Sequence, residues 1–142
     1  MLHVMKGGRP VVDAILIVDD ESDVAESCAR ILKRAGFSCL VANDVPMALW
    51  FFDLHQPELV LSDIDLGSGN GFEIALYVGQ KAPATPVILM TSSSYVGMDA
   101  LKVASRAGAA GYLRKPFSNS ELIATVRFLL STKRGDHSGL GG

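Results

Sequence analysis

The sequence predicts an α/β fold, a three-layer sandwich in which helices cover both faces of a five-stranded parallel sheet. Ala14–Val18 and Leu59–Asp63 are short, mostly apolar runs, typical of strands that are buried on both faces. Three further strand-like segments alternate with segments of helical apolar spacing, and short connections join them. This alternation implies right-handed crossovers, which place helices on both sides of the sheet.

The first half of the chain predicts two strands and two helices, bounded by capping residues, glycine and proline. The expected elements are a strand at Ala14–Val18, a helix capped by Ser22 or Asp23 and ended by Gly36, a strand at Ser38–Ala42, and a helix capped by Asn43 or Asp44 and stopped by Pro57. Trp50 falls where the apolar pattern leaves it partly exposed. We interpret it as a packed rim residue, with a partner contact as the alternative.

The second half predicts three strands and three helices, and its last helix begins with a Ser-x-x-Glu capping box. The expected elements are strands at Leu59–Asp63, Val87–Met90 and Gly111–Lys115, and helices at Phe72–Gln80, at Tyr95–Arg106, and from Ser118 to about Ser131. The glycine-rich loop from Gly67 to Gly71 lacks the Lys-Ser/Thr ending of a phosphate-binding loop, so we interpret it as a flexible connection.

The length and composition fit one domain with a substantial core. The chain has 142 residues, 49% of them hydrophobic, which leaves little room for a second domain. Residues 1–13 are expected to be a flexible lead-in, residues 14–131 the folded domain, and residues 132–142 a flexible polar tail.

Charge and cysteine content exclude several classes of function. The formal net charge is −2 and the basic residues are scattered, so direct nucleic-acid binding is not expected. Cys28 and Cys39 lack the spacing of a metal or redox motif and are interpreted as reduced core thiols. No apolar run approaches the roughly 20 residues that span a bilayer, and the first residues do not resemble a signal peptide. We therefore expect a cytoplasmic protein without membrane attachment.

Polar residues stand at the carboxyl ends of four of the five predicted strands. They are Asp19 and Asp20, Asp63, Thr91, and Lys115. Because the carboxyl ends of parallel strands meet at one edge of the sheet, these side chains are expected to lie close together. Two carboxylates about 4 Å apart repel by roughly 4 kcal/mol at an effective dielectric near 20, so the cluster needs a cation. Oxygen ligands without His or Cys favour Mg2+.

A metal, a carboxylate, a hydroxyl and an ammonium group together suit phosphoryl transfer to Asp63, which would give an aspartyl phosphate. Each residue also has an ordinary structural alternative. Asp63 and Thr91 could cap turns or helices, and Lys115 could be a solvated strand end. Tyr112 could be a rim aromatic. Their joint occurrence favours the functional interpretation.

From Ala14 to about Leu130 the chain resembles the receiver domain of two-component response regulators. The motifs that carry the resemblance are Ile17-Val18-Asp19-Asp20-Glu21, Leu61-Ser62-Asp63, Gly71, Met90-Thr91-Ser92 and Gly111-Tyr112-Leu113-Arg114-Lys115-Pro116-Phe117. Each motif is weak alone, and their order and spacing make the set specific. The resemblance implies a flavodoxin-like sheet with strand order 2-1-3-4-5.

The resemblance also implies a role for each site residue. Asp63 would accept the phosphoryl group. Asp20 would bind Mg2+ directly, Asp19 largely through water, and Asp65 through its backbone carbonyl. Thr91 would hydrogen-bond a phosphoryl oxygen, and Lys115 would pair with the phosphoryl group or with Asp63. Ser92 would leave access to the phosphoryl group, and Tyr112 would move inward as the domain switches. A cis peptide is implied at Lys115-Pro116. Gly67 and Asn70 depart from the usual proline and acidic residue of the loop, which is expected to be looser, and Asp65 occupies a position that tunes phosphoryl lifetime.

The expected function is therefore Mg2+-dependent acceptance of a phosphoryl group from a sensor histidine kinase or phosphotransfer protein. Acceptance would switch a face that binds a downstream protein, with a homodimer as one form, and the chain is not expected to be an enzyme in its own right. One alternative is a haloacid-dehalogenase-like phosphatase built on Asp63 and Asp65, although Asp19 and Asp20 precede that motif in an order atypical of such enzymes. The other is a degenerate receiver that only docks. No output domain follows the last predicted helix, so both a stand-alone regulator and a piece of a longer one remain open.

Overall fold

The computed structural model describes residues 5–6, 9–10, 14–92, 102 and 105–139. Its centre is a five-stranded, all-parallel sheet in the order β4-β3-β5-β6-β7, which confirms the predicted order 2-1-3-4-5 for these strands. The strands are β3 (Ala14–Val18), β4 (Ser38–Ala42), β5 (Leu59–Asp63), β6 (Val87–Thr91) and β7 (Gly111–Arg114).

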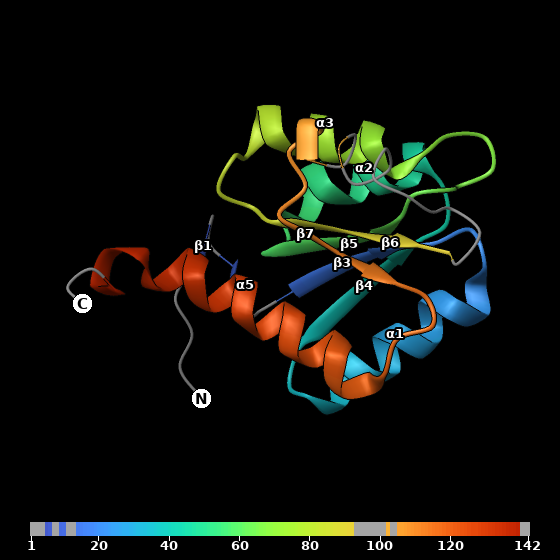
Figure 1. Ribbon diagram of the computed structural model, residues 1–142. Coiled ribbons are helices and arrows are strands. Elements are labelled where there is room, and N and C mark those ends of the chain that lie inside the picture. The colour runs from blue at the N-terminus through green and yellow to red at the C-terminus, as the bar shows by residue number, and fades with distance from the viewer. Residues whose placement is uncertain (1–4, 7–8, 11–13, 93–101, 103–104, 140–142) are drawn as a thin grey trace.

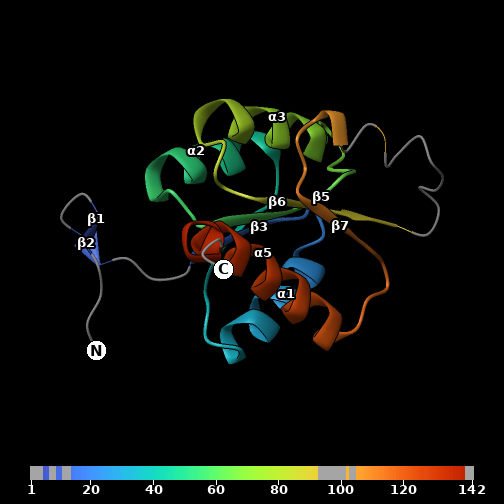
Figure 2. The same cartoon turned by 60° about the vertical axis from the view of Figure 1, so that its left-hand side comes forward.

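Helices cover both faces of this sheet, as expected. They are α1 (Ser22–Arg34), α2 (Val45–His55), α3 (Gly71–Lys81) and α5 (Asn119–Gly139). Figures 1 and 2 show α2 and α3 on one face and α1 and α5 on the other. No helix within the described ranges is long and apolar enough to cross a membrane.

The core has two halves, one on each side of the sheet, because side chains alternate along each strand. Leu16 and Val60 point into the half beneath α2 and α3, and Ile17 and Leu61 point into the half beneath α1 and α5. Every residue of β5 and β6 is buried. The central strands therefore form a rigid base for the residues at their carboxyl ends.

Local capping sets where the helices begin. The side chain of Asp44 accepts a hydrogen bond from the Met47 N–H at the start of α2. Of the two predicted caps, Asn43 and Asp44, it is therefore Asp44 that caps this helix. Helix α1 begins differently from the prediction: Glu21 occupies the N-cap position and makes no side-chain capping bond. Helix α3 begins with a capping box of Asn70 and Glu73 that the sequence interpretation, which treated Asn70 as part of a flexible loop, did not anticipate.

Three segments outside the central sheet bear on the predicted boundaries. The helix expected over Tyr95 to Arg106 lies largely outside the described residues, of which Lys102, Ser105 and Arg106 are helical. Within the expected lead-in, β1 (Met5–Lys6) pairs antiparallel with β2 (Arg9–Pro10). Helix α5 continues to Gly139, beyond the boundary predicted near Ser131; the added residues include no proline, so each of them can donate a helical backbone hydrogen bond.

Candidate functional site

The predicted site residues meet at the carboxyl edge of the sheet. Asp63 is the last residue of β5 and Thr91 the last residue of β6, whereas Asp19 and Lys115 directly follow β3 and β7. Pairing of Asp63 with Met90 aligns the ends of β5 and β6. Parallel pairing therefore brings together side chains that are up to 96 positions apart in the sequence.

Three carboxylates converge at this edge. Asp19, Asp20 and Asp63 each place one carboxylate oxygen within 4.8 Å of the others. Asp19 is fully buried and Asp63 nearly so, whereas Asp20 is exposed. The cluster thus extends from the protein interior to solvent.

Backbone and amide groups hold Asp19 in place. Its Oδ1 accepts a hydrogen bond from the Glu21 N–H at 3.0 Å, and its N–H donates to the Ala42 carbonyl at 3.1 Å. The Asn43 side-chain amide donates to the Asp19 carbonyl oxygen at 3.0 Å. The sequence interpretation considered Asn43 only as a helix cap. Its position directly after β4, at the same edge, is the signal that could have found it.

Lys115 supplies the only ammonium group paired with this cluster among the described residues. Its Nζ lies 3.0 Å from Asp19 Oδ2 and 3.4 Å from Asp63 Oδ2. Burial lowers the pKa of Lys115, but the hydrogen bond and charge of Asp19, followed by those of Asp63, raise it above its ordinary value of 10.5. The side chain therefore remains charged between the two carboxylates. The Lys115-Pro116 peptide is cis, as the resemblance implied.

Opposing influences act on the pKa of Asp63. Burial raises the pKa of Asp63 above its ordinary value of 3.8 and the charge of Asp19 adds to this, while Lys115 opposes it. A carboxylate that is partly desolvated and only partly neutralised retains its basic oxygen. This suits a nucleophile, provided that further positive charge is available at the site.

The donor set fits a divalent cation that prefers oxygen. Three carboxylates and one ammonium group leave two net negative charges, and neither His nor Cys is part of the cluster. Beside it is an open cavity of about 320 Å³, lined by Asp20, Glu21, Asp63, Ile64, Asp65, Ser92 and Lys115. This space can hold a hydrated ion and a phosphoryl-sized group. Mg2+ retains several waters and commonly takes only one or two carboxylates, so it matches this arrangement.

Not all predicted residues join the carboxylate cluster. The Asp65 side chain is exposed and its Oδ1 accepts a hydrogen bond from the Gly67 N–H at 3.2 Å. Thr91 is buried and does not line the cavity, whereas the exposed Ser92 does. Tyr112, on β7, is exposed.

Close packing behind Asp63 restricts the start of α3. A Cβ added to Gly71 would lie 2.5 Å from the Asp63 carbonyl oxygen and 3.0 Å from Leu89 Cδ2. The buried Ser62 hydroxyl donates to the same carbonyl oxygen at 2.9 Å. The resemblance included Gly71 without a physical reason, and the structure provides one.

Fold and site together define a doubly wound α/β domain with a carboxylate cluster that could hold a cation at the carboxyl edge of its sheet. The family described as response regulator receiver domain matches residues 15–127 of the chain. The chain therefore belongs to the response regulator receiver domain family, as the resemblance implied. The haloacid-dehalogenase alternative is not supported by this match.

Curated relatives are about one third identical to this chain over the residues that align. The sensory transduction protein RegX3 of Mycobacterium tuberculosis is 34% identical over 130 residues, which cover 88% of this chain and 54% of that protein. The transcriptional regulatory protein PdtaR of the same species is 32% identical over 121 residues, 84% of this chain and 58% of PdtaR. The chain thus spans little more than half the length of these relatives.

Solved structures show the same fold. A CheY-like receiver domain protein from Methanospirillum hungatei superposes with a TM-score of 0.83 at 25% identity, covering 89% of this chain and 99% of that one. The receiver domain of NtrX from Brucella abortus gives a TM-score of 0.77 at 30% identity, covering 83% and 98% of the two chains.

Proposed function

We propose that this domain accepts a phosphoryl group on Asp63 and that the reaction depends on Mg2+. The observation that carries the proposal is the convergence of Asp19, Asp20 and Asp63, with Lys115 bridging two of them. Because the chain belongs to the receiver domain family, we expect the phosphoryl donor to be a phosphohistidine of a sensor histidine kinase or phosphotransfer protein. Such an exchange would take place in the cytoplasm, and its output would be the binding of a downstream protein.

The reaction can be described by what the chain's own residues do. An Asp63 carboxylate oxygen attacks phosphorus, the new O–P bond forms as the N–P bond of the phosphohistidine breaks, and the electron pair stays on the imidazole nitrogen, which takes a proton from solvent. Lys115 already lies 3.4 Å from Asp63 and is available to pair with a phosphoryl oxygen. Ser92 lines the cavity without filling it, so a donor can approach.

Bound Mg2+ would supply positive charge to the phosphoryl oxygens during transfer. Asp20 and Asp63 would bind it directly and Asp19 largely through water, with the Asp65 carbonyl as a further ligand. The exposed Asp20 gives the ion a route from solvent, and the buried Asp19 fixes the inner side of the site.

The switch would connect Thr91 to Tyr112. In register, Thr91 on β6 pairs with Arg114 on β7, and Tyr112 lies two residues earlier on the same strand. A phosphoryl group on Asp63 would draw the Thr91 hydroxyl toward it, and the exposed Tyr112 ring would turn inward. The surface around β7 and α5 would then change its fit to a partner.

The experiment that tests the proposal is labelling with acetyl phosphate, read by intact mass. The unmodified chain should gain one phosphoryl group with MgCl2 present and none with EDTA, and hydroxylamine should remove it because it is an acyl phosphate. Asp63→Asn should abolish the gain, whereas Asp65→Asn, which alters a carboxylate outside the cluster, should retain it. Labelling that persists in Asp63→Asn would refute the assignment, and a complete lack of labelling would favour the docking-only alternative.

A further inference from the structure

Helix α2 is apolar on nearly every side. Its sequence, VPMALWFFDLH, has only Asp53 and His55 as polar residues. A helix of this composition is normally buried all round. Here, however, Trp50 is 63% exposed and Leu54 is 48% exposed. Because residues four apart lie on the same face of a helix, these two form an outward apolar surface, which we call the α2 ridge.

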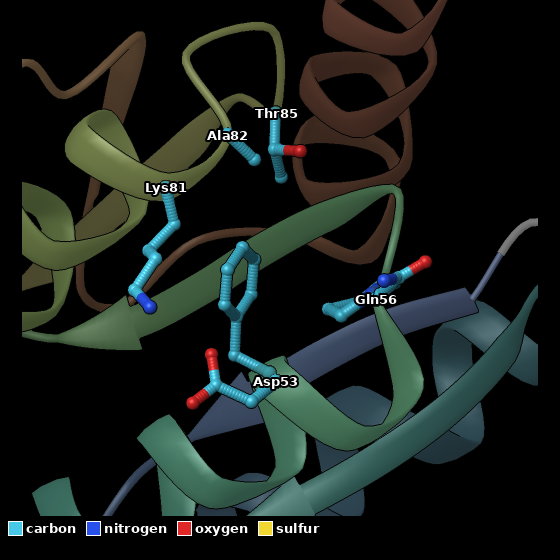
Figure 3. A pocket seen from close by; sticks show the side chains of 7 residues that line it. Asp53, Gln56, Lys81, Ala82 and Thr85 are labelled. Atoms are coloured by element: carbon cyan, nitrogen blue, oxygen red, sulfur yellow. The ribbon is translucent and has the colours of Figure 1, made fainter.

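A cavity of about 290 Å³ lies beside this ridge, between the C-terminal ends of α2 and α3 (Figure 3). Phe52, Pro57 and Ala82 contribute apolar lining. Gln56 ends α2 in a left-handed conformation, with φ 50° and ψ 62°, and the turn it makes into Pro57 forms one wall. The cavity is therefore adjacent to the α2 ridge and belongs partly to the same helix.

Two opposite charges stand at the rim of the cavity. Asp53 accepts a hydrogen bond from the Tyr77 hydroxyl at 2.7 Å, and Lys81 Nζ lies 5.3 Å from the centre of the Tyr77 ring. Tyr77 thus fixes the acidic side of the rim and attracts the basic side toward it. A partner that carries the same two charges can pair with both of them in reverse.

The size of the cavity limits what can occupy it. Pockets for drug-sized ligands or cofactors have volumes of roughly 300–1,000 Å³, so this one is at the lower limit and suits a single large side chain. Its partly apolar lining and polar rim match an aromatic ring that carries one N–H donor, which is a tryptophan. The chain itself presents such a residue at Trp50, one helical turn from Asp53.

We propose that α2 mediates self-association, with Trp50 of each copy entering the α2–α3 cavity of a second copy. Trp50 and the cavity-lining Asp53 are three residues apart on α2 and are therefore neighbours on its surface. A two-fold axis can then satisfy both contacts at once and close the assembly as a dimer. Leu54 would pack near the axis, and Asp53 and Lys81 would pair across it. The occupant is another copy of this chain because one chain carries the projecting Trp50, the cavity, and the opposite charges of Asp53 and Lys81, which complement each other across a two-fold axis.

The dimer should be weak and reversible. A buried aromatic side chain contributes roughly 150–250 Å², so two Trp50 rings and the α2 ridges leave the interface below the approximately 1,200 Å² of standard complexes. Interfaces of this size typify transient contacts. Monomer and dimer should therefore exchange within the micromolar to millimolar range of protein concentration.

Trp50 is the chain's only tryptophan, so its fluorescence reports directly on the proposed contact. We would measure emission and acrylamide quenching over that concentration range, without phosphoryl donor, beside sedimentation equilibrium. The expected result is a blue shift and a loss of more than half of the quenching as the dimer forms. Emission that stays that of an exposed indole at every concentration, or growth beyond the dimer, would overturn the proposal.

Variants test whether the dimer depends on the cavity and the α2 ridge or on exposed apolar residues in general. Ala82→Leu fills the cavity but keeps Trp50 as reporter, and it should keep the indole exposed and the chain monomeric. Leu54→Asp should also prevent dimers, whereas Leu76→Asp, at a 51% exposed residue of α3, should not. Phe128→Asp tests the 65% exposed aromatic of α5 and should likewise leave the dimer intact. Dimers that survive Ala82→Leu, or that only Phe128→Asp removes, would contradict the contact, with circular dichroism checking that each variant is folded.

Discussion

Replacement of Lys115 by methionine should be the most informative change at the acidic edge, because it removes charge and keeps most of the volume. The ammonium group lies 3.0 Å from Asp19 and 3.4 Å from Asp63, contacts worth about 5 kcal/mol each at an effective dielectric near 20 before desolvation. Without it, two carboxylates whose oxygens lie within 4.8 Å repel by at least about 3 kcal/mol. Breaking a buried ion pair on one side costs about 3–5 kcal/mol, and we expect Lys115→Met to lose this much stability.

Urea unfolding at pH 7, followed by circular dichroism, measures the loss in EDTA and in MgCl2. Mg2+ should stabilise Lys115→Met more than the parent, because the carboxylates bind a cation more tightly once the competing ammonium charge is gone. An ion at 100 times its Kd contributes about 2.7 kcal/mol. Adding Asp63→Asn to Lys115→Met should recover part of the lost stability by removing one repelling charge.

The control is Lys33→Met, which changes an exposed lysine in the last turn of α1 and should cost at most about 0.3–1 kcal/mol of stability. A loss below about 1 kcal/mol for Lys115→Met, or no difference in the Mg2+ response, would refute the charge argument.

Two further predictions concern the core around this edge. Gly71→Ala should destabilise the protein by about 1–3 kcal/mol in urea unfolding because its Cβ would meet the Asp63 carbonyl oxygen, whereas Gly79→Ala in the same helix has open space and should stabilise it by about 0.5–1 kcal/mol; equal effects would contradict the packing. Burial, and then the charge of Asp19, raise the pKa of the Cys28 thiol from 9.0 to about 11, outweighing Lys115, so the folded state keeps a proton that the unfolded state loses. The free energy of unfolding should therefore fall as pH rises from 9 to 11, with a loss of about 1 kcal/mol reached at pH 10. Under reducing conditions, the loss of stability between pH 8 and pH 10 should be smaller in Cys28→Ala than in the parent by this amount.

The parts that the sequence predicted well depend on periodicity and on one topological rule. Apolar runs located β3 and β5, and the rule that parallel strands end at one edge predicted that Asp19, Asp63 and Lys115 lie close together, as the structure shows. Local chemistry was enough here because each of these residues directly ends or follows a strand.

The parts that were missed depend on packing between distant segments. The sequence interpretation treated Asn70 as part of a loop, yet its capping box with Glu73 starts α3 one residue earlier than predicted. The resemblance implied a pairing of Lys115 with Asp63, which the structure shows, but not its closer pairing with Asp19, because that contact follows from side-chain geometry across 96 residues. The exposure of Trp50 was anticipated, but the cavity beside it is formed by α3 as well as α2 and leaves no pattern in either helix alone.

The charge at the acidic edge also explains why one ammonium group is not sufficient. Lys115 leaves two net negative charges among Asp19, Asp20 and Asp63, and a phosphoryl group on Asp63 would replace a singly charged carboxylate by a group carrying close to two charges. The need for a dication is therefore greater after transfer than before it. Because coupling between two ligands is reciprocal, Mg2+ should favour phosphorylation of Asp63 by the same factor by which phosphorylation tightens Mg2+ binding. In this arrangement Lys115 keeps the carboxylates together in the resting domain and leaves an excess of negative charge that a divalent ion can neutralise.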